Sequence, residues 1–206
     1  MSAEFDVAVV GATGAVGETM IAILEERNFP VRNLYPLASS RSAGKTVMFR
    51  GAAIKVTDLA AFDFSQARIG LFSAGGSISA EYAPRAGAAG CVVIDNTSHF
   101  RQDPEIPLVV PEVNIEALAA YSRHNIIANP NCSTIQMLVA LKPIYDAVGI
   151  ERINVATYQA VSGTGKGAIE ELAGQTARLL NGQEIECEVY PRQIAFNALP
   201  HIDIFQ

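Results

Sequence analysis

A glycine-rich segment, GATGAVG at 11–17, directly follows an apolar run at 5–10. Apolar residues then recur at helical spacing over 18–27, so the chain is predicted to open as strand, turn and helix. Glycines in such a turn let the backbone approach a pyrophosphate at the helix N-terminus, where unpaired amides are available. The spacing Gly-x-x-Gly-x-x-Gly is less common than Gly-x-Gly-x-x-Gly, and a tight turn without a ligand is the alternative.

Further short apolar runs indicate more strands. They lie at 34–38, 69–72, 92–94 and 126–128 and are separated by helical or loop segments. This alternation is typical of an α/β fold, and we predict a Rossmann-like doubly wound parallel sheet. Pro104, Pro107 and Pro111 predict an irregular loop after Asn96, and such loops often carry binding residues.

A second unit is predicted to begin at the segment NPN, which spans 129–131. A helix over 133–148 leads into a β-rich stretch at 153–161, and another periodic helix follows at 168–180. We therefore place the domain boundary at 130/131, with an α/β domain over 1–130 and the start of an α+β domain over 131–206.

Composition narrows the class of partner. The net charge is −6, and no dense Lys/Arg patch is present, which argues against nucleic acid or an anionic membrane surface. No apolar stretch is long enough to span a bilayer. The three cysteines are widely spaced and odd in number, which fits a reducing compartment and gives no metal-ligand spacing. We expect a cytoplasmic protein that binds small molecules and no metal.

The segment SSRSAGK at 39–45 bears on cofactor choice. A NAD site usually presents a carboxylate after the second strand for the ribose 2′-hydroxyl, and this segment contains none. Arg41 can fork onto a 2′-phosphate while Ser39 and Ser42 donate hydrogen bonds, which favours NADP. A solvated basic loop is the alternative. Gly75, in SAGGS, is a candidate for a second backbone contact with the dinucleotide, although a simple turn explains it nearly as well.

Cys132 is the candidate nucleophile because it stands immediately before a predicted helix, where the helix dipole favours a thiolate. Such a thiolate adds to an aldehyde, and loss of a hydride to a nicotinamide then gives a thioester. The alternative of a buried, inert cysteine fits Cys91 well and Cys187 reasonably.

The segments GATGAVG, SSRSAGK, SAGGS, DNTSHFR, NPNCST and YQAVSG, in this order and spacing, make the chain resemble the aspartate-semialdehyde dehydrogenases over its whole length. The resemblance implies NADP-dependent, phosphorylating interconversion of L-aspartate 4-semialdehyde and L-4-aspartyl phosphate, in the biosynthesis of lysine, threonine and methionine. It makes Cys132 the acyl-thioester nucleophile and Gln159 the residue that positions the substrate. Arg101 and Asn131 would bind phosphate and the acyl phosphate. The expected cofactor-binding residues are Gly11, Thr13, Gly14, Ala15, Val16, Ser39, Arg41, Ser42, Gly75, Ser162 and Gly163.

The resemblance also implies a longer protein. The family's catalytic histidine, a phosphate-binding lysine and a substrate-binding arginine come from a part beyond this length, so His99, His124 and His201 are interpreted as structural. By the same resemblance, 1–130 is the NADP-binding domain and 131–206 is part of a substrate and dimerisation domain, with a homodimer or higher homo-oligomer expected for the full-length form. An enzyme like N-acetyl-γ-glutamyl-phosphate reductase and a non-catalytic NADP-binding fragment remain the alternatives.

Overall fold

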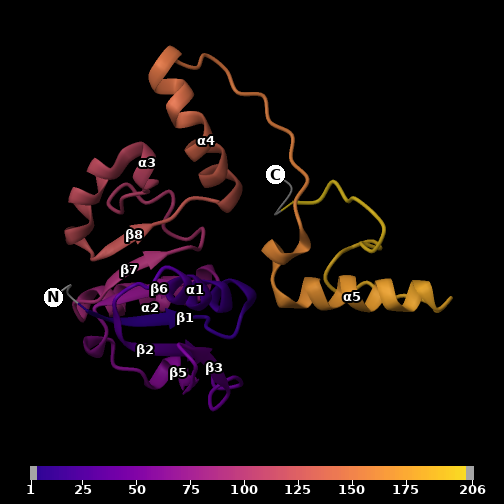
Figure 1. Cartoon of the computed structure of the whole chain (residues 1–206), viewed down its shortest axis with the longest axis horizontal. Coiled ribbons are helices and arrows are strands. Elements are labelled where there is room, and N and C mark those ends of the chain that lie inside the picture. Colours follow the sequence, from indigo (N-terminus) through magenta and orange to yellow (C-terminus); the bar gives the residue numbers. More distant parts are fainter. Residues whose placement is uncertain (1–3, 203–206) are drawn as a thin grey trace. The chain divides into compact units, whose positions relative to one another are not determined.

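The computed structural model describes residues 4–202, and its contacts divide the chain into two compact units, Met1–Arg152 and Ile153–Gln206 (Figure 1). The helices are α1 (Ala15–Glu26), α2 (Gly76–Ala88), α3 (Pro111–Asn114), α4 (Cys132–Val148) and α5 (Lys166–Leu180), with short 3-10 turns η1 (Leu59–Ala61), η2 (Phe64–Gln66), η3 (Ile115–Arg123) and η4 (Val161–Thr164). The strands are β1 (Phe5–Val10), β2 (Val31–Ala38), β3 (Thr46–Phe49), β4 (Ala52–Lys55), β5 (Thr57–Asp58), β6 (Ile69–Phe72), β7 (Val92–Asp95) and β8 (Ile126–Ala128).

A six-stranded parallel sheet forms the centre of the first unit, in the order β5-β2-β1-β6-β7-β8. All five apolar runs predicted as strands are strands in this sheet, so the predicted α/β class is confirmed. The chain passes from β1 to β2 on one side, whereas β6 lies on the other side of β1. The direction of winding thus changes between β1 and β6, and ligands bind in the crevice at the carboxyl ends of such strands.

The two faces of β1 belong to two different cores, as the alternation of side chains along a strand requires. Val7 and Val9 pack in a cluster with Ile21 of α1. Ala8 and Val10 pack in the other cluster, which contains Ala83 of α2. Helices therefore cover both faces of the sheet, which makes it doubly wound.

An antiparallel hairpin of β3 and β4 was not anticipated from the sequence. Its two-residue turn consists of Arg50 and Gly51 with φ of 51° and 76°, which is the positive-φ geometry that a tight hairpin requires. The Arg50 guanidinium donates to the carbonyl oxygens of Val31 and Phe29 at 2.9 and 2.7 Å. The hairpin is thereby fastened to the start of β2.

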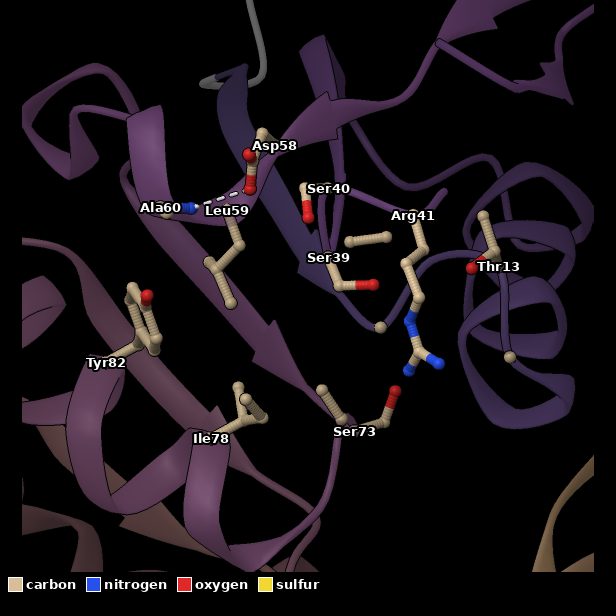
Figure 2. Close-up of a pocket in the computed structure, with 14 residues that line it drawn as sticks. Thr13, Ser39, Ser40, Arg41, Asp58, Leu59, Ala60, Ser73, Ile78 and Tyr82 are labelled. Carbon is tan, nitrogen blue, oxygen red and sulfur yellow. Dashed lines mark hydrogen bonds between the residues drawn. The ribbon is translucent and has the colours of Figure 1, made fainter. Parts of the chain in front are cut away.

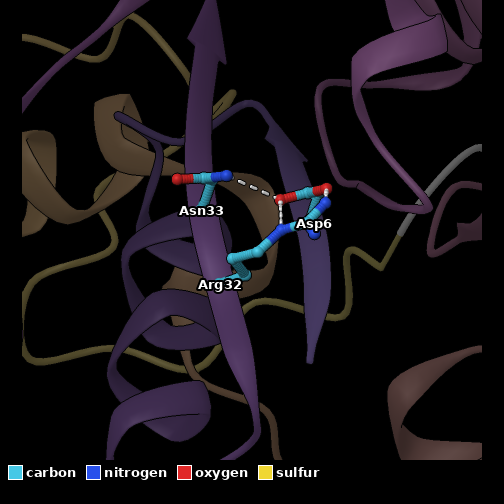
Figure 3. A network of polar contacts seen from close by, with 3 residues as sticks. All are labelled: Asp6, Arg32 and Asn33. Atoms are coloured by element: carbon cyan, nitrogen blue, oxygen red, sulfur yellow. Dashed lines mark hydrogen bonds and ion pairs between the residues drawn. The ribbon is translucent and has the colours of Figure 1, made fainter. Parts of the chain in front are cut away.

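A polar cluster lies at the amino end of the sheet (Figure 3). Asp6 accepts hydrogen bonds from Arg32 Nε at 3.0 Å and Asn33 Nδ2 at 2.8 Å, and Arg32 also forms an ion pair with it. The hydrogen bond from Arg32, assisted by that from Asn33, holds the pKa of Asp6 below its ordinary value. The cluster joins β1 to β2 far from the carboxyl ends of the strands.

In the second unit, α5 is bound to the loop that follows it. The Glu171 carboxylate accepts the backbone amide of Glu188 at 2.8 Å. The side-chain oxygen of the buried Gln175 accepts the amides of Ile194 and Ala195 at 2.9 and 3.2 Å. The predicted helix at 168–180 is confirmed, and two of its polar side chains hold the loop in place.

The β-rich stretch predicted at 153–161 is not a strand in the structure, and this prediction was wrong. Residues 152–160 have no regular secondary structure, and every side chain from 151 to 160 is exposed. A strand needs a partner for its backbone groups, and no described residue pairs with this segment. The predicted domain boundary at 130/131 lies before α4, whereas the contacts place α4 in the first compact unit and divide the chain after Arg152.

Candidate active site

The turn from β1 to α1 contains two glycines whose positions exclude a side chain. A Cβ on Gly11, which has a φ of +90°, would lie 3.1 Å from the backbone nitrogen of Ala74. A Cβ on Gly17 would lie 2.1 Å from the carbonyl oxygen of Gly11. The turn therefore packs backbone against backbone, both onto the end of β6 and onto its own helix. Gly14 is the N-cap of α1 and supplies no side-chain cap, so the first amides of the helix face the crevice uncapped.

A cavity of about 560 Å³ lies at the carboxyl ends of β1, β2, β5 and β6 (Figure 2). This volume is within the range typical of ligand sites. The described residues that line it are Gly11, Thr13, Gly14, Ala38, Ser39, Ser40, Arg41, Asp58, Leu59, Ala60, Ser73, Ala74, Ile78 and Tyr82. Five of the predicted cofactor residues therefore share one cavity, namely Gly11, Thr13, Gly14, Ser39 and Arg41.

One part of the cavity is polar and cationic. In Figure 2 the Arg41 side chain extends from the end of β2 toward the space between Ser73 and Thr13. Arg41 is exposed and forms no ion pair within residues 4–202. Its guanidinium is thus available to an anionic ligand.

The opposite part of the cavity is apolar, with Leu59 of η1 and Ile78 and Tyr82 of α2 as its wall. Such a surface suits a flat aromatic ring. Between this wall and the polar part lies Asp58, which the sequence analysis missed. Because Ala38 and Asp58 are register partners in β2 and β5, the carboxylate stands beside the end of the second strand. The expectation that no carboxylate is available there is therefore corrected.

Cys132 is exposed and is the first residue of α4, which begins one residue earlier than the predicted helix at 133. The side-chain oxygen of Asn131 caps the helix, accepting the amides of Ser133 at 3.0 Å and Thr134 at 3.4 Å. The dipole of this long helix stays directed at the thiol, while the cap satisfies two of the amides in its first turn.

The other two cysteines differ from each other. Cys91 is buried, and burial raises the pKa of its thiol to about 12, which agrees with an inert residue. Cys187 is exposed, so the expectation that it is buried was wrong. Cys187 lies in the loop that follows α5, where its sulfur accepts a long contact of 3.6 Å from the Gln175 side chain.

Arg101 is held in place by backbone carbonyls. Its Nε donates to the carbonyl of Asn129 at 3.0 Å and its Nη2 to the carbonyl of Asn96 at 3.1 Å. The Asn129 side chain in turn donates to the Asn96 side chain at 2.8 Å. Two of the five guanidinium N–H groups are thus occupied, and the remaining ones are free for an anion.

Asp95 holds the segment that leads to Arg101 in place, and the sequence analysis did not single it out. It is fully buried at the end of β7 and accepts from Ser79 Oγ at 2.7 Å, Thr97 Oγ1 at 2.8 Å and the Thr97 amide at 3.1 Å. These bonds fix the turn that begins with Asn96 and leads to Arg101.

Residues 6–121 match the family model described as semialdehyde dehydrogenase, NAD binding domain, and residues 141–206 match semialdehyde dehydrogenase, dimerisation domain. The chain belongs to the semialdehyde dehydrogenase family. The resemblance found in the sequence is confirmed by an aspartate-semialdehyde dehydrogenase of Shewanella sp. (strain DB6705), which is 67% identical over 205 residues, covering 100% of this chain and 61% of that protein.

Solved structures of semialdehyde dehydrogenases agree. A crystal structure of aspartate semialdehyde dehydrogenase II complexed with ASA from Vibrio cholerae has a TM-score of 0.97 and 65% identity, over 100% of this chain and 61% of that one. The enzyme from Candida albicans, solved with NADP, has a TM-score of 0.60 and 25% identity, over 72% of this chain and 48% of that one. The chain thus spans about 61% of the length of its bacterial relatives.

The remaining predicted site residues of this semialdehyde dehydrogenase chain are distributed as follows. Ala15 and Val16 form the first turn of α1, Ser42 lies in the turn after β2, and Gly75 is the N-cap of α2. Gln159, Ser162 and Gly163 belong to the second unit. There, Gln159 is exposed, and its side-chain oxygen accepts a hydrogen bond from Thr157 at 3.1 Å.

Residues 4–202 contain neither a candidate metal site nor a candidate membrane span. No cluster of three or more His, Cys, Asp or Glu side chains is arranged to hold a metal ion there. No helix in that range combines the length and the apolar character needed to cross a membrane. His99 stacks edge-on against Phe100 at 4.6 Å, and His124 pairs with Glu105 at 3.3 Å, so both have structural partners.

Proposed function

We propose that this chain is part of an NADP-dependent, phosphorylating aspartate-semialdehyde dehydrogenase that uses Cys132 as its nucleophile. The observation that carries the proposal is the exposed thiol at the first residue of α4, in a chain 67% identical to an aspartate-semialdehyde dehydrogenase. An exposed thiol at a helix N-terminus is the arrangement that favours a reactive thiolate.

The chemistry proceeds in two covalent stages. The Cys132 thiolate adds to the aldehyde carbon of L-aspartate 4-semialdehyde and forms a thiohemiacetal. When bound, the nicotinamide supplies an acceptor for the hydride that leaves this carbon. The resulting thioester is attacked by an oxygen of inorganic phosphate, the carbon–sulfur bond breaks, and L-4-aspartyl phosphate leaves as the thiolate is regenerated. In the reverse direction the same protein would make the semialdehyde for lysine, threonine and methionine synthesis.

The cavity at the sheet edge fits the dinucleotide. Gly11 and Gly17 keep the backbone of the turn free of side chains, and the uncapped amides of α1 suit a pyrophosphate. Arg41 and Ser39 would hold the 2′-phosphate of NADP, and the apolar wall at Tyr82 would hold the adenine. The related Candida albicans enzyme, solved with NADP, supports this assignment.

Arg101 would bind the phosphate that attacks the thioester. Its guanidinium is fixed by Asn96 and Asn129 and keeps N–H groups free for two phosphate oxygens. The Asn131 side chain uses only its oxygen for the helix cap, so its amide group remains to donate. By the family resemblance, Gln159 is proposed as a substrate contact, and Ser162 and Gly163 as cofactor contacts.

The complete protein is proposed to be a homodimer or higher homo-oligomer, because residues 141–206 match a dimerisation domain. The general base and further substrate contacts are expected from the part of the family that lies beyond the length of this chain. An enzyme acting on N-acetyl-γ-glutamyl phosphate is the second candidate, since the family model covers semialdehyde dehydrogenases in general.

The test follows NADPH formation from L-aspartate 4-semialdehyde and NADP, with and without phosphate. In the full-length protein, which would supply the general base, we expect turnover that requires phosphate and is abolished in Cys132→Ser but retained in Cys187→Ser, the matched exposed cysteine. Activity with N-acetyl-glutamate semialdehyde alone would favour the second candidate.

A second readout tests the nucleophile without turnover. Alkylation of Cys132 by iodoacetamide should be faster than that of Cys187 under the same conditions, because only Cys132 stands at a helix N-terminus. Equal, slow rates at the two cysteines would contradict the nucleophile and favour a non-catalytic fragment.

A further inference from the structure

The cavity at the carboxyl edge of the sheet contains two opposite charges that do not neutralise each other. Of the described residues that line it, Arg41 and Asp58 are the charged ones. No ion pair joins them in the described part of the chain. Figure 2 shows them on different sides of Ser39, with Arg41 directed toward Ser73 and Asp58 close to Ser40. A ligand in this cavity therefore meets a cation and a carboxylate separately.

Asp58 lies one strand outward from the place of the carboxylate in NAD sites, because β5 flanks β2 on the side away from β1. In such sites an acidic residue at the end of the second strand accepts a hydrogen bond from the ribose 2′-hydroxyl. Here the second strand ends in Ala38, and the parallel register of β5 brings Asp58 beside it. A neighbouring strand thus supplies the group that β2 lacks.

The carboxylate has an oxygen to spare for a ligand. Asp58 is half-buried, and its Oδ1 accepts the Ala60 amide at 3.1 Å as the cap of η1. Within residues 4–202, its second oxygen has no hydrogen-bond partner. Asp58 lines the cavity, and the bond to the Ala60 amide restricts its side chain, so the carboxylate is offered to a ligand there at little entropic cost.

We propose that Asp58 is a specificity-determining residue that lowers the preference of this cavity for NADP over NAD. A 2′-phosphate is attracted by Arg41 and repelled by Asp58, whereas a 2′-hydroxyl donates to Asp58. The site therefore binds NAD as well as NADP, with a smaller difference than Arg41 alone would produce. This inference rests on the proposed dinucleotide site.

The test is calorimetric titration of the protein with NADP and with NAD, which requires no turnover. In Asp58→Asn the ratio of the NAD dissociation constant to the NADP dissociation constant should rise about three- to tenfold, the effect of removing one like charge near the 2′-phosphate. Asparagine keeps an oxygen that accepts the Ala60 amide, so η1 retains its cap.

The matched control is Asp63→Asn. Asp63 caps η2 by accepting the Ser65 amide at 3.0 Å, in the same manner as Asp58, and it does not line the cavity. In Asp63→Asn the ratio of the NAD to the NADP dissociation constant should equal that of the unchanged protein. If both nucleotides bind but Asp58→Asn leaves the ratio unchanged, the role of Asp58 is overturned and the dinucleotide site stands. If neither nucleotide binds the unchanged protein, the dinucleotide site itself is overturned, and this inference with it.

Discussion

Arg101 donates a hydrogen bond from Nε to the backbone carbonyl of Asn129 at 3.0 Å, three residues before Cys132. The same guanidinium donates to the carbonyl of Asn96, so it joins the segment after β7 to the segment after β8. The proposed phosphate ligand is therefore attached to the stretch of backbone that leads into the nucleophile. The planar guanidinium suits this role, because its several N–H donors can reach carbonyls from two different loops at once.

Arg101→Lys should retain the positive charge and lose the fixed orientation, because an ammonium cannot bridge both carbonyls and still face a phosphate. We expect phosphate-dependent turnover to fall about 10²-fold, as when a preorganised donor is lost. NADP binding should stay unchanged. The measurement is the initial rate as a function of phosphate concentration.

The control for this change is Arg178→Lys, since Arg178 of α5 forms an exposed pair with Glu186. It should leave the rate within about twofold, in keeping with the small contribution of surface pairs. A normal phosphate dependence in Arg101→Lys would remove Arg101 from the proposed mechanism.

Asp95→Ala should destabilise the first unit because it leaves three buried donors, from Ser79 and Thr97, without their acceptor. The expected loss is about 3 kcal/mol in the free energy of unfolding, measured by urea denaturation. Asp103→Ala is the control, since the exposed Asp103 accepts a single amide, that of Glu105, at 2.9 Å. A similar small loss in both variants would show that the buried network contributes little.

Much of the first unit was predictable because its signals are local. The apolar runs are strands buried on both faces, and the glycine-rich turn joins β1 to α1 where the spacing indicated. The turn Arg50-Gly51 was equally local, and a two-residue loop ending in glycine between apolar-containing runs is a signal for the hairpin that was overlooked.

Other features depend on contacts distant in sequence. Asp58 reaches the cavity because β5 pairs with β2, and no spacing along the chain encodes that register. The stretch at 153–161 has β-type residues but lacks a strand to pair with among residues 4–202, so propensity alone did not produce a strand. Gln159, within this stretch, has its role proposed from the family resemblance rather than from a contact with Cys132.

Gly17→Ala tests whether the turn of the cofactor loop tolerates a side chain. Its Cβ would lie 2.1 Å from the Gly11 carbonyl oxygen, so the helix must shift away from the end of β1. We expect a loss of about 1–3 kcal/mol in unfolding free energy, the usual cost of overpacking, together with weaker NADP binding. The measurements are urea denaturation and calorimetric titration.

The control is Gly174→Ala in the interior of α5, where a new Cβ meets no atom within 4 Å. This change should stabilise the protein by up to about 1 kcal/mol, because alanine has a higher helix propensity than glycine. Tight NADP binding by Gly17→Ala would show that the close approach of helix and strand is not required for the cofactor site.

Asp6→Asn tests the polar cluster at the amino end of the sheet through pH (Figure 3). In the folded protein the hydrogen bond from Arg32 keeps the pKa of Asp6 below its ordinary value of 3.8, so the unfolded chain takes up this proton first as the solution is acidified. The contribution of Asp6 to stability is therefore complete above the ordinary pKa and is lost as pH falls through the lowered one. The asparagine variant, which has no such proton to bind, should be less stable near neutral pH, and its stability should approach that of the unchanged protein at acidic pH.

Urea denaturation at a series of pH values measures the difference in unfolding free energy, with Asp103→Asn as the exposed control. If the difference between Asp6→Asn and the unchanged protein does not shrink as the pH is lowered, the charge of Asp6 contributes nothing to folding.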